Sequence, residues 1–209
     1  MTPPANPIDR WKGEFGDAYV ARNVADKAIV SVMRGVFARV LAPVSMAPPR
    51  SILEVGCNIG INLRALRLLG DAELFAVEPN VTARRRVLAD GIVDAAHLFD
   101  ATGDALPMAD ATVDLAFTAG VLIHIPEPHL QATMREIHRV SRRYVLCMEY
   151  FARNPETIRY RGHDDMLFKR DFGGLYLDLF PDLRIVADGF FWRRSTGADD
   201  LTWCLFEKS

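Results

Sequence analysis

Few features of membrane, disulfide-rich or metal-binding proteins occur in this sequence of 209 residues. No apolar stretch reaches the ~18 uncharged residues typical of a membrane-spanning helix, and the start MTPPANPIDRWKG lacks the apolar centre of a signal peptide. The cysteines, Cys57, Cys147 and Cys204, show no CxxC spacing, which disfavours zinc and disulfides and favours core thiols in a reducing compartment. We therefore expect a cytoplasmic protein.

The sequence also lacks an excess of either charge, because 25 basic and 27 acidic residues give a net charge of −2. This balance disfavours nucleic acid as a partner, although the basic residues are mostly arginine and could be clustered. Repeats and low-complexity tracts are missing. Half of the residues are hydrophobic, enough for the core of one α/β domain. We expect a single domain over residues 1–209, with disorder over residues 1–10.

The segment SILEVGCNIGINLRALRLLG, which starts at Ser51, is the most informative part of the chain. Residues 52–55 form an apolar run typical of a buried parallel strand, and a helical pattern follows directly. Between them, Gly56 and Gly60 let the backbone turn sharply and leave bare main chain beside a ligand. Such strand-turn-helix units bind nucleotide-like cofactors at the turn.

The chemistry of this turn and of two later segments favours S-adenosylmethionine over a dinucleotide. A dinucleotide site would carry GxGxxG, but Asn58 stands where the second glycine is expected. Glu54, at the strand end, can take a ligand ammonium, and Glu78, at the end of the strand ELFAVEP, can accept both hydroxyls of a ribose. Asp104, in GDALPM, can meet an adenine amino group, with the backbone beyond it at the ring edge.

Strand and helix patterns alternate along the chain and predict an α/β protein with a doubly wound, mostly parallel sheet of seven strands. After the two strands named above, strands are expected within residues 96–100, 113–125 and 144–151. The pairing of residues 183–194 with residues 201–208 reads as a closing hairpin, so that the last strand enters the sheet antiparallel.

Two segments stand outside this alternation. Helical periodicity runs as one pattern from Asp17 to Leu41, and we expect residues 11–50 to form a helical lid before the first strand. Residues 154–171 form a long polar insertion without an evident regular structure. Long insertions of this kind are often functional, so we expect this one to contact the substrate.

Five segments carry a resemblance to a known family: GEFGDAYVARN, EVGCNIGINLRAL, FTAGVLIHI, YRGHDDMLFKRDF and DDLTWCLFEK. Together, from about Trp11 to Lys208, they are similar to the methylases associated with pseudaminic acid biosynthesis, within the class I S-adenosylmethionine-dependent methyltransferases. The resemblance implies a Rossmann-like fold and methyl transfer to O or N of a small acidic sugar, either a nonulosonic acid of the pseudaminic type or its nucleotide-activated form. The first motif of the class is usually ExGxGxG, and Asn58 replaces its middle glycine.

The cofactor site expected from the turn, the strand ends and the resemblance includes a lid from the N-terminal helix. There, Tyr19 and Arg22 share one helix face and can contact the methionine carboxylate or the acceptor. Alternatively, both only pack the helix on the sheet, with Arg22 paired to Asp26. The expected cofactor contacts are Tyr19, Arg22, Glu54, Gly56, Cys57, Asn58, Gly60, Glu78, Pro79, Asp104, Ala105, Leu106, Thr118, Ala119 and Gly120.

His124 is the first catalytic candidate, because it follows the fourth strand at the carboxyl edge of the sheet. Methyl transfer needs collinear alignment, and it needs a base where the acceptor loses a proton, a task that imidazole suits. Alternatively, His124 only caps the loop or touches the cofactor. Glu149, at the end of the fifth strand, can orient an acceptor amine or hydroxyl, or be a partly exposed strand end. Ligand spacing for a metal is missing here, so we expect none.

The insertion and its flanks supply the expected acceptor contacts, which are Tyr150, Tyr160, Arg161, His163, Lys169 and Arg170. Guanidinium groups bind carboxylate or phosphate through paired hydrogen bonds, as an acidic sugar would require. The alternative is a solvated loop whose basic groups pair with Asp164, Asp165 and Asp171. For the whole chain, the alternatives are methylation of another small metabolite, or a cofactor-binding module without turnover. We expect a monomer or a homodimer.

Overall fold

The computed structural model describes residues 7–209, and the disorder expected for residues 1–6 lies outside the described residues. For residues 7–10 that prediction was wrong, because Pro7–Lys12 form a 3-10 helix, η1. Packing against the rest of the protein explains why this segment is ordered. Ile8 is buried, and the Trp11 ring lies 5.0 Å from the Phe15 ring between centroids.

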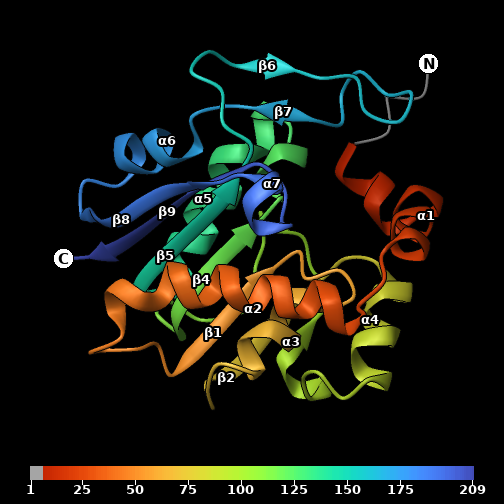
Figure 1. Ribbon diagram of the computed structural model, residues 1–209. Coiled ribbons are helices and arrows are strands. Elements are labelled where there is room, and N and C mark those ends of the chain that lie inside the picture. Colours follow the sequence, from red (N-terminus) through yellow and green to blue (C-terminus); the bar gives the residue numbers. More distant parts are fainter. Residues whose placement is uncertain (1–6) are drawn as a thin grey trace.

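A seven-stranded sheet in the order β3-β2-β1-β4-β5-β9-β8 forms the centre of the molecule (Figure 1). The pairs among β1 to β5 are parallel, whereas β9 runs antiparallel to both β5 and β8. The predicted fold is thus confirmed, including the antiparallel last strand. The strands are β1 Ser51–Val55, β2 Glu73–Val77, β3 Leu98–Phe99, β4 Val113–Ala119, β5 Ser141–Glu149, β8 Leu183–Phe191 and β9 Leu201–Lys208.

Helices cover both faces of the sheet, as continuous apolar strands require (Figure 1). One core packs α2 and α3 against residues such as Ile52 and Phe117, and the other packs α5 and α6 against residues such as Leu53 and Val145. No helix within residues 7–209 is long and apolar enough to span a membrane. The α-helices are α1 Glu14–Arg22, α2 Lys27–Leu41, α3 Ile61–Arg67, α4 Val81–Ala89, α5 Glu127–Val140, α6 Phe172–Leu179 and α7 Arg193–Thr196, and the further 3-10 helices are η2 Ala42–Val44, η3 Ala95–His97 and η4 Leu122–His124.

The N-terminal helical segment is two helices, not the one continuous helix expected from its periodicity. The chain leaves α1 at Asn23, whose side-chain amide donates to the Tyr19 carbonyl at 2.7 Å. Asp26 then caps α2 by accepting the backbone N–H of Ile29 at 2.9 Å. Asp26 therefore caps a new helix instead of pairing with Arg22, whose guanidinium lies 5.3 Å from the centre of the Tyr19 ring.

The insertion has more regular structure than expected, because β6 (Glu156–Thr157) and β7 (Phe168–Lys169) pair as a small antiparallel ribbon. Asp171 ends the insertion by capping α6, accepting the N–H of Gly174 at 2.8 Å. A paired ribbon that is fixed at this end can present side chains in defined positions.

Loss of the Asp26 cap should destabilise the N-terminal half without touching the sheet. We expect Asp26→Ala to cost about 1 kcal/mol of unfolding free energy and to lower Tm by about 2–4 °C in a chain of this size. Thermal unfolding followed by circular dichroism measures the change. Asp71→Ala, in the exposed turn before β2, is the control, and equal Tm values for the two variants would contradict the capping role.

Candidate functional site

A cavity of about 840 Å³ opens at the carboxyl ends of β1, β2 and β4. Its floor lies at the point where the sheet order reverses, since β2 and β4 flank β1 on opposite sides. Helices η1 and α1, the end of the insertion and the loop before β9 complete its walls. Most predicted site residues line it: Tyr19, Arg22, Glu54, Gly56, Cys57, Asn58, Glu78, Pro79, Ala119, Gly120, His124, Tyr150, Tyr160 and Arg161.

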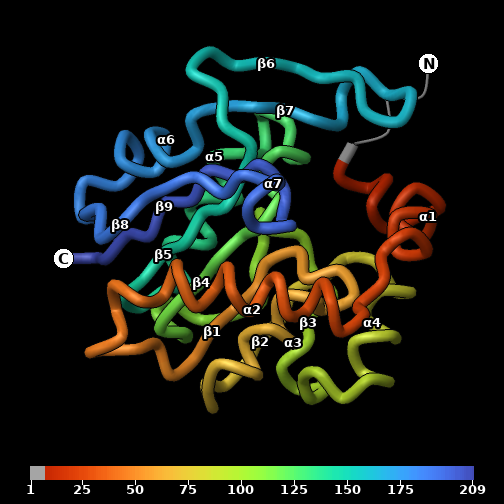
Figure 2. Tube along the Cα trace, in the orientation of Figure 1, coloured from red at the N-terminus to blue at the C-terminus, as the bar shows by residue number. Residues whose placement is uncertain are grey.

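Two segments that are far apart in the sequence meet above this cavity. Arg10, in η1, forms an ion pair with Asp165 of the insertion at 2.6 Å. The Phe15 ring also approaches the rings of Tyr160 and His163, with centroids 6.3 and 5.6 Å away. The N-terminal segment and the insertion therefore lie side by side over the site (Figure 2).

The glycine turn after β1 has a left-handed backbone at three alternate positions. The φ angles are 78° at Gly56, 47° at Asn58 and 73° at Gly60. A Cβ atom on Gly56 would lie 2.7 Å from a methyl group of Val121, so glycine is required there. Gly60 serves the turn but does not line the cavity as we predicted, because it is the N-cap of α3 and faces Ile92 and Val87.

Two buried carboxylates lie at neighbouring strand ends in this wall. Glu78 accepts the N–H of Asn58 at 2.7 Å through Oε2 and the N–H of Asn80 at 2.8 Å through Oε1. Glu54 accepts the side-chain amide of Asn62 at 2.6 Å through Oε1, while its Oε2 is buried without a partner among the described residues.

Burial affects the pKa of both groups. Burial raises the pKa of Glu54 to about 8, against the hydrogen bond from Asn62, which lowers it. It also raises the pKa of Glu78, although the N–H groups of Asn80 and Asn58 and the nearby Arg84 oppose the shift. The site thus favours a cation that would restore the charged form of Glu54.

The predicted adenine contacts Asp104, Ala105 and Leu106 do not line the cavity. Their polar groups already have partners within the protein. Asp104 bonds to the Thr102 hydroxyl at 2.6 Å and to His129 Nδ1 at 3.2 Å, and the N–H of Leu106 donates to Glu136 at 2.8 Å. The wall here is formed by Ala101, Thr102 and Gly103.

Thr118 and Glu149 were also predicted to face the ligand, but neither lines the cavity. Glu149 is 2% exposed, and its two oxygens accept the N–H groups of Val121 and Ile123 at 3.2 and 3.3 Å. Burial raises its pKa to about 7, while the Thr118 side chain and the N–H groups of η4 lower it. Glu149 therefore holds the turn that carries His124.

His124 lines the cavity with one ring nitrogen fixed by the protein. Its Nδ1 lies 2.5 Å from the carbonyl oxygen of Met166, which can only accept, so Nδ1 carries the hydrogen and Nε2 keeps a lone pair. Burial lowers the pKa of His124 to about 4, against the opposing effect of the Met166 carbonyl. The imidazole is therefore neutral at physiological pH.

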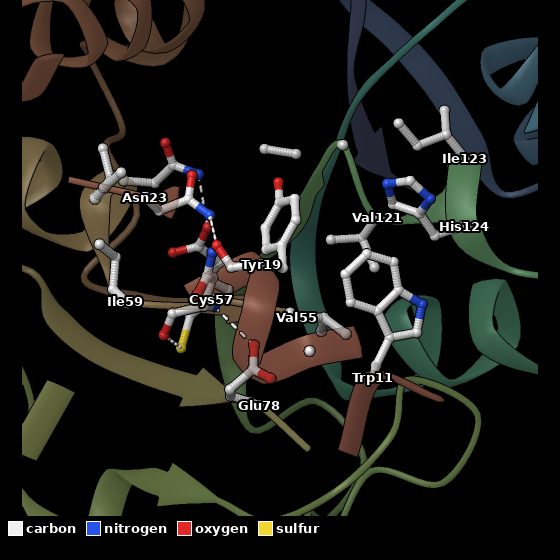
Figure 3. Close-up of a pocket in the computed structure, with 18 of the residues that line it drawn as sticks. Trp11, Tyr19, Asn23, Val55, Cys57, Ile59, Glu78, Val121, Ile123 and His124 are labelled. Carbon is white, nitrogen blue, oxygen red and sulfur yellow. Dashed lines mark hydrogen bonds between the residues drawn. The ribbon is translucent and has the colours of Figure 1, made fainter. Parts of the chain in front are cut away.

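Aromatic rings form the wall of the cavity around His124. Its ring lies 4.7 Å from Trp11 and 5.2 Å from Tyr160 between centroids, and Trp11 lies 5.3 Å from Tyr19. Figure 3 shows the Tyr19 ring between Cys57 and Glu78 on one side and Trp11 and His124 on the other. Tyr19 therefore lies at the border between the carboxylate end and the aromatic end.

Two arginines at the rim of the cavity have no carboxylate partner within residues 7–209. They are Arg22, over the ring of Tyr19, and Arg161, over the ring of Tyr160 at 5.4 Å. Other arginines in this region are paired, as Arg193 is with Asp199 at 3.9 Å. Unpaired guanidinium groups at a cavity rim suit an anionic ligand.

Three predicted acceptor contacts from the insertion do not reach the cavity. Arg170 forms an ion pair with Glu127 at the start of α5. His163 packs on Phe15, and Lys169 is opposite Glu156 in the ribbon. Arg170 and His163 therefore have partners within the protein, and Lys169 lies in the ribbon away from the cavity lining.

Sequence reasoning also missed several cavity residues. Trp11 and Asn80 line it, and Asn80 ties the lid to the sheet by donating to the Trp11 carbonyl at 3.1 Å. Asp199 lines it from the loop before β9 and accepts the Tyr150 hydroxyl at 3.2 Å. Asp199 lies in a polar loop between two strands, and no sequence pattern there indicates a site residue. Trp11 is a large aromatic residue at the start of the predicted lid, and this feature could have indicated a contact with the ligand.

Across residues 7–209, no group of three or more His, Cys, Asp or Glu side chains is placed to hold a metal ion. Cys57, Cys147 and Cys204 are free thiols.

Comparisons with known proteins agree with this geometry. Residues 52–143 match a family model, Methyltransf_25, described as a methyltransferase domain. No curated protein matches the chain. Among solved structures, the chain is similar to Burkholderia thailandensis 1,6-didemethyltoxoflavin-N1-methyltransferase with bound 1,6-didemethyltoxoflavin and S-adenosylhomocysteine, at 16% identity and a TM-score of 0.71, covering 100% of this chain and 93% of that one.

Two further structures share the fold. Magnesium protoporphyrin IX methyltransferase from Synechocystis, with bound S-adenosylmethionine, is 11% identical with a TM-score of 0.68, covering 100% of both chains. An S-adenosylmethionine-dependent methyltransferase from Leishmania major is 15% identical with a TM-score of 0.71, covering 98% of this chain and 87% of that one. The chain thus has the class I methyltransferase fold, and the domain match and the fold together support an S-adenosylmethionine-dependent methyltransferase.

Proposed function

We propose that this protein transfers the methyl group of S-adenosylmethionine to an oxygen or nitrogen of a small anionic acceptor. An acidic sugar of the nonulosonic type, or its nucleotide-activated form, is the acceptor class that the sequence favours. The observation that carries the proposal is one cavity with two kinds of wall. Carboxylates and bare backbone form one end, and aromatic rings with the unpaired Arg22 and Arg161 form the other.

The carboxylate end fits the nucleoside and amino acid parts of the cofactor. The buried, unpartnered Oε2 of Glu54 would accept the ammonium group, and Glu78 has lone pairs left for the ribose hydroxyls. The backbone of the glycine turn lines the cavity beside them at Gly56. The bound cofactor supplies a sulfonium methyl group as electrophile.

The aromatic end fits an acceptor that carries an anion. Arg161 and Arg22 would pair with a carboxylate or phosphate, and the rings of Trp11 and Tyr160 would stack on an apolar sugar face. Asp199, next to the Tyr150 hydroxyl, offers an acceptor for a hydroxyl or amine of the ligand. The low-identity neighbours act on other molecules, so a different small anionic metabolite remains a second acceptor class for the same site.

His124 would accept or orient the acceptor proton. The Met166 carbonyl fixes the hydrogen on Nδ1, so that Nε2 is the free basic atom. Glu149 fixes the turn that carries His124 through the N–H groups of Val121 and Ile123. With a pKa of about 4, His124 stays neutral and is a weak base, so it suits an acceptor whose proton leaves late in the reaction. Cytoplasmic location and the oligomeric state stay predictions.

Cofactor binding should release a proton from Glu54. The pKa of Glu54 is about 8, so the group is mostly protonated at neutral pH, and a bound ammonium favours the carboxylate. Affinity for S-adenosylhomocysteine should therefore rise between about pH 6 and about pH 8 as the cost of losing that proton falls. Calorimetry in phosphate and Tris buffers, which differ in ionisation enthalpy, measures the released proton.

Glu54→Gln should remove the proton release, and Glu73→Gln, at the opposite end of β2, should leave it unchanged. Binding without proton release in the wild type would overturn the role of Glu54. Absence of binding in the wild type would overturn the proposed function, and binding without turnover on any acceptor would indicate a non-catalytic module.

The acceptor anion should depend on Arg161. We expect Arg161→Ala to raise the KM for the acceptor about ten- to a hundredfold, with little change in kcat, because a charged hydrogen bond that forms before the reaction is lost. Arg159→Ala is the matched control, since Arg159 is two residues away, exposed and outside the cavity. Release of S-adenosylhomocysteine with acidic, nucleotide-activated and neutral sugars measures both constants. If the two variants have the same kcat and KM, the insertion is a solvated surface loop and does not bind the acceptor.

The neutral imidazole predicts an unusual pH profile. His124→Ala should lower turnover by a factor of about 10² to 10⁴ while leaving affinity for S-adenosylhomocysteine unchanged. In the wild type, histidine protonation should not limit the rate near the ordinary pKa of 6.5, because the pKa of His124 is about 4. His97→Ala, outside the cavity, is the control. A rate that falls around pH 6.5 and depends on His124 would contradict the buried neutral state.

A further inference from the structure

Asn58 has a backbone conformation that its own surroundings do not explain. Its φ angle of 47° lies in the left-handed region, between the left-handed Gly56 and Gly60. Asparagine tolerates this region mainly because its side chain can hydrogen-bond to nearby backbone. Here the side-chain oxygen Oδ1 is buried and has no hydrogen-bond partner among residues 7–209. Glycine would therefore suit the turn at least as well in the free protein.

The place of Asn58 in the cavity wall indicates what could use this oxygen. Asn58 lines the cavity, and its backbone N–H donates to Oε2 of Glu78 at 2.7 Å. Its backbone carbonyl lies 3.5 Å from the thiol of Cys57. The Asn58 side chain thus starts from a backbone that is already fixed against the Glu78 carboxylate.

Buried oxygens without partners occur at two cavity residues, Glu54 and Asn58, within the described chain. Each requires a hydrogen-bond donor from a ligand or a water molecule. The Glu54 carboxylate suits a cationic donor. The neutral amide oxygen of Asn58 suits a hydroxyl, and its neighbour Glu78 is the carboxylate assigned to the ribose.

We propose that the side-chain amide of Asn58 binds the ribose of the cofactor together with Glu78, as a recognition group that a glycine at this position would lack. The inference rests on the proposed function and deepens it. The ribose hydroxyls would then be shared between a charged acceptor, Glu78, and a neutral amide, Asn58. No protein group within residues 7–209 donates to the amide oxygen, and a ribose hydroxyl would supply that hydrogen bond.

The test compares Asn58→Gly with a matched glycine substitution elsewhere. Ala111 also has a left-handed backbone, with φ of 51°, but lies outside the cavity. Ala111→Gly therefore relieves similar backbone strain without removing a cavity side chain. Both variants should fold with a Tm at or above that of the wild type, because neither loses a hydrogen bond between its side chain and the protein.

The probes are S-adenosylhomocysteine and methylthioadenosine, which share the ribose but differ in the amino acid part. We expect Asn58→Gly to weaken both by a similar factor of about two to ten, as the loss of one neutral hydrogen bond would. Ala111→Gly should leave both affinities unchanged. Calorimetric titration gives the dissociation constants.

Two results would overturn the inference while leaving the proposed function intact. Unchanged affinity of Asn58→Gly for both probes would show that the amide does not bind the cofactor. Weaker binding of S-adenosylhomocysteine alone would place the amide at the amino acid part and not at the ribose. If the wild type binds neither probe, the proposed function fails, and this inference fails with it.

Discussion

The site depends on carboxylates at strand ends that accept backbone N–H groups from the neighbouring loops. Glu78, at the end of β2, binds the N–H groups of Asn58 and Asn80 and so joins the glycine turn to the start of α4. Glu149, at the end of β5, does the same for Val121 and Ile123 before His124. Buried backbone donors need partners, and a carboxylate can satisfy two of them from a single position. Both loops are thereby fixed relative to the sheet before any ligand enters.

The sequence could predict those parts of the fold that depend on local patterns. Strand runs such as ILEV, together with the Gly56 turn, indicate a parallel sheet and a ligand at its carboxyl edge, because apolar runs and glycine turns are local signals. The break between α1 and α2 was missed although Asp26 is a good cap. The two helices pack on different parts of the molecule, α2 on the sheet and α1 on η1 and α4, and the periodicity alone does not show the break of a few residues between them.

The candidate site was predictable where a residue acts through its place in a strand, and not where it acts through a partner distant in sequence. Glu54 and Glu78 follow from strand ends, and both line the cavity. Glu149 lies at an equivalent strand end, but its carboxylate accepts hydrogen bonds from backbone N–H groups 28 and 26 residues earlier in the chain. No local sequence pattern reveals these bonds. Arg170 likewise forms an ion pair with Glu127, 43 residues earlier in the chain, and is not free to bind a ligand. Long-range polar pairing thus decides which charged residues remain available to a ligand.

Ion pairing also decides which arginines on the basic side of the cavity remain free for a ligand. Carboxylates of the insertion and its surroundings neutralise Arg10, Arg159 and Arg170, while Arg22 and Arg161 keep only aromatic neighbours among the described residues. Stacking on an aromatic ring orients a guanidinium and leaves its N–H donors free. A rim of oriented, unpaired guanidinium groups around a neutral histidine is therefore electrostatically suited to an anion, and this supports the anionic acceptor proposed above.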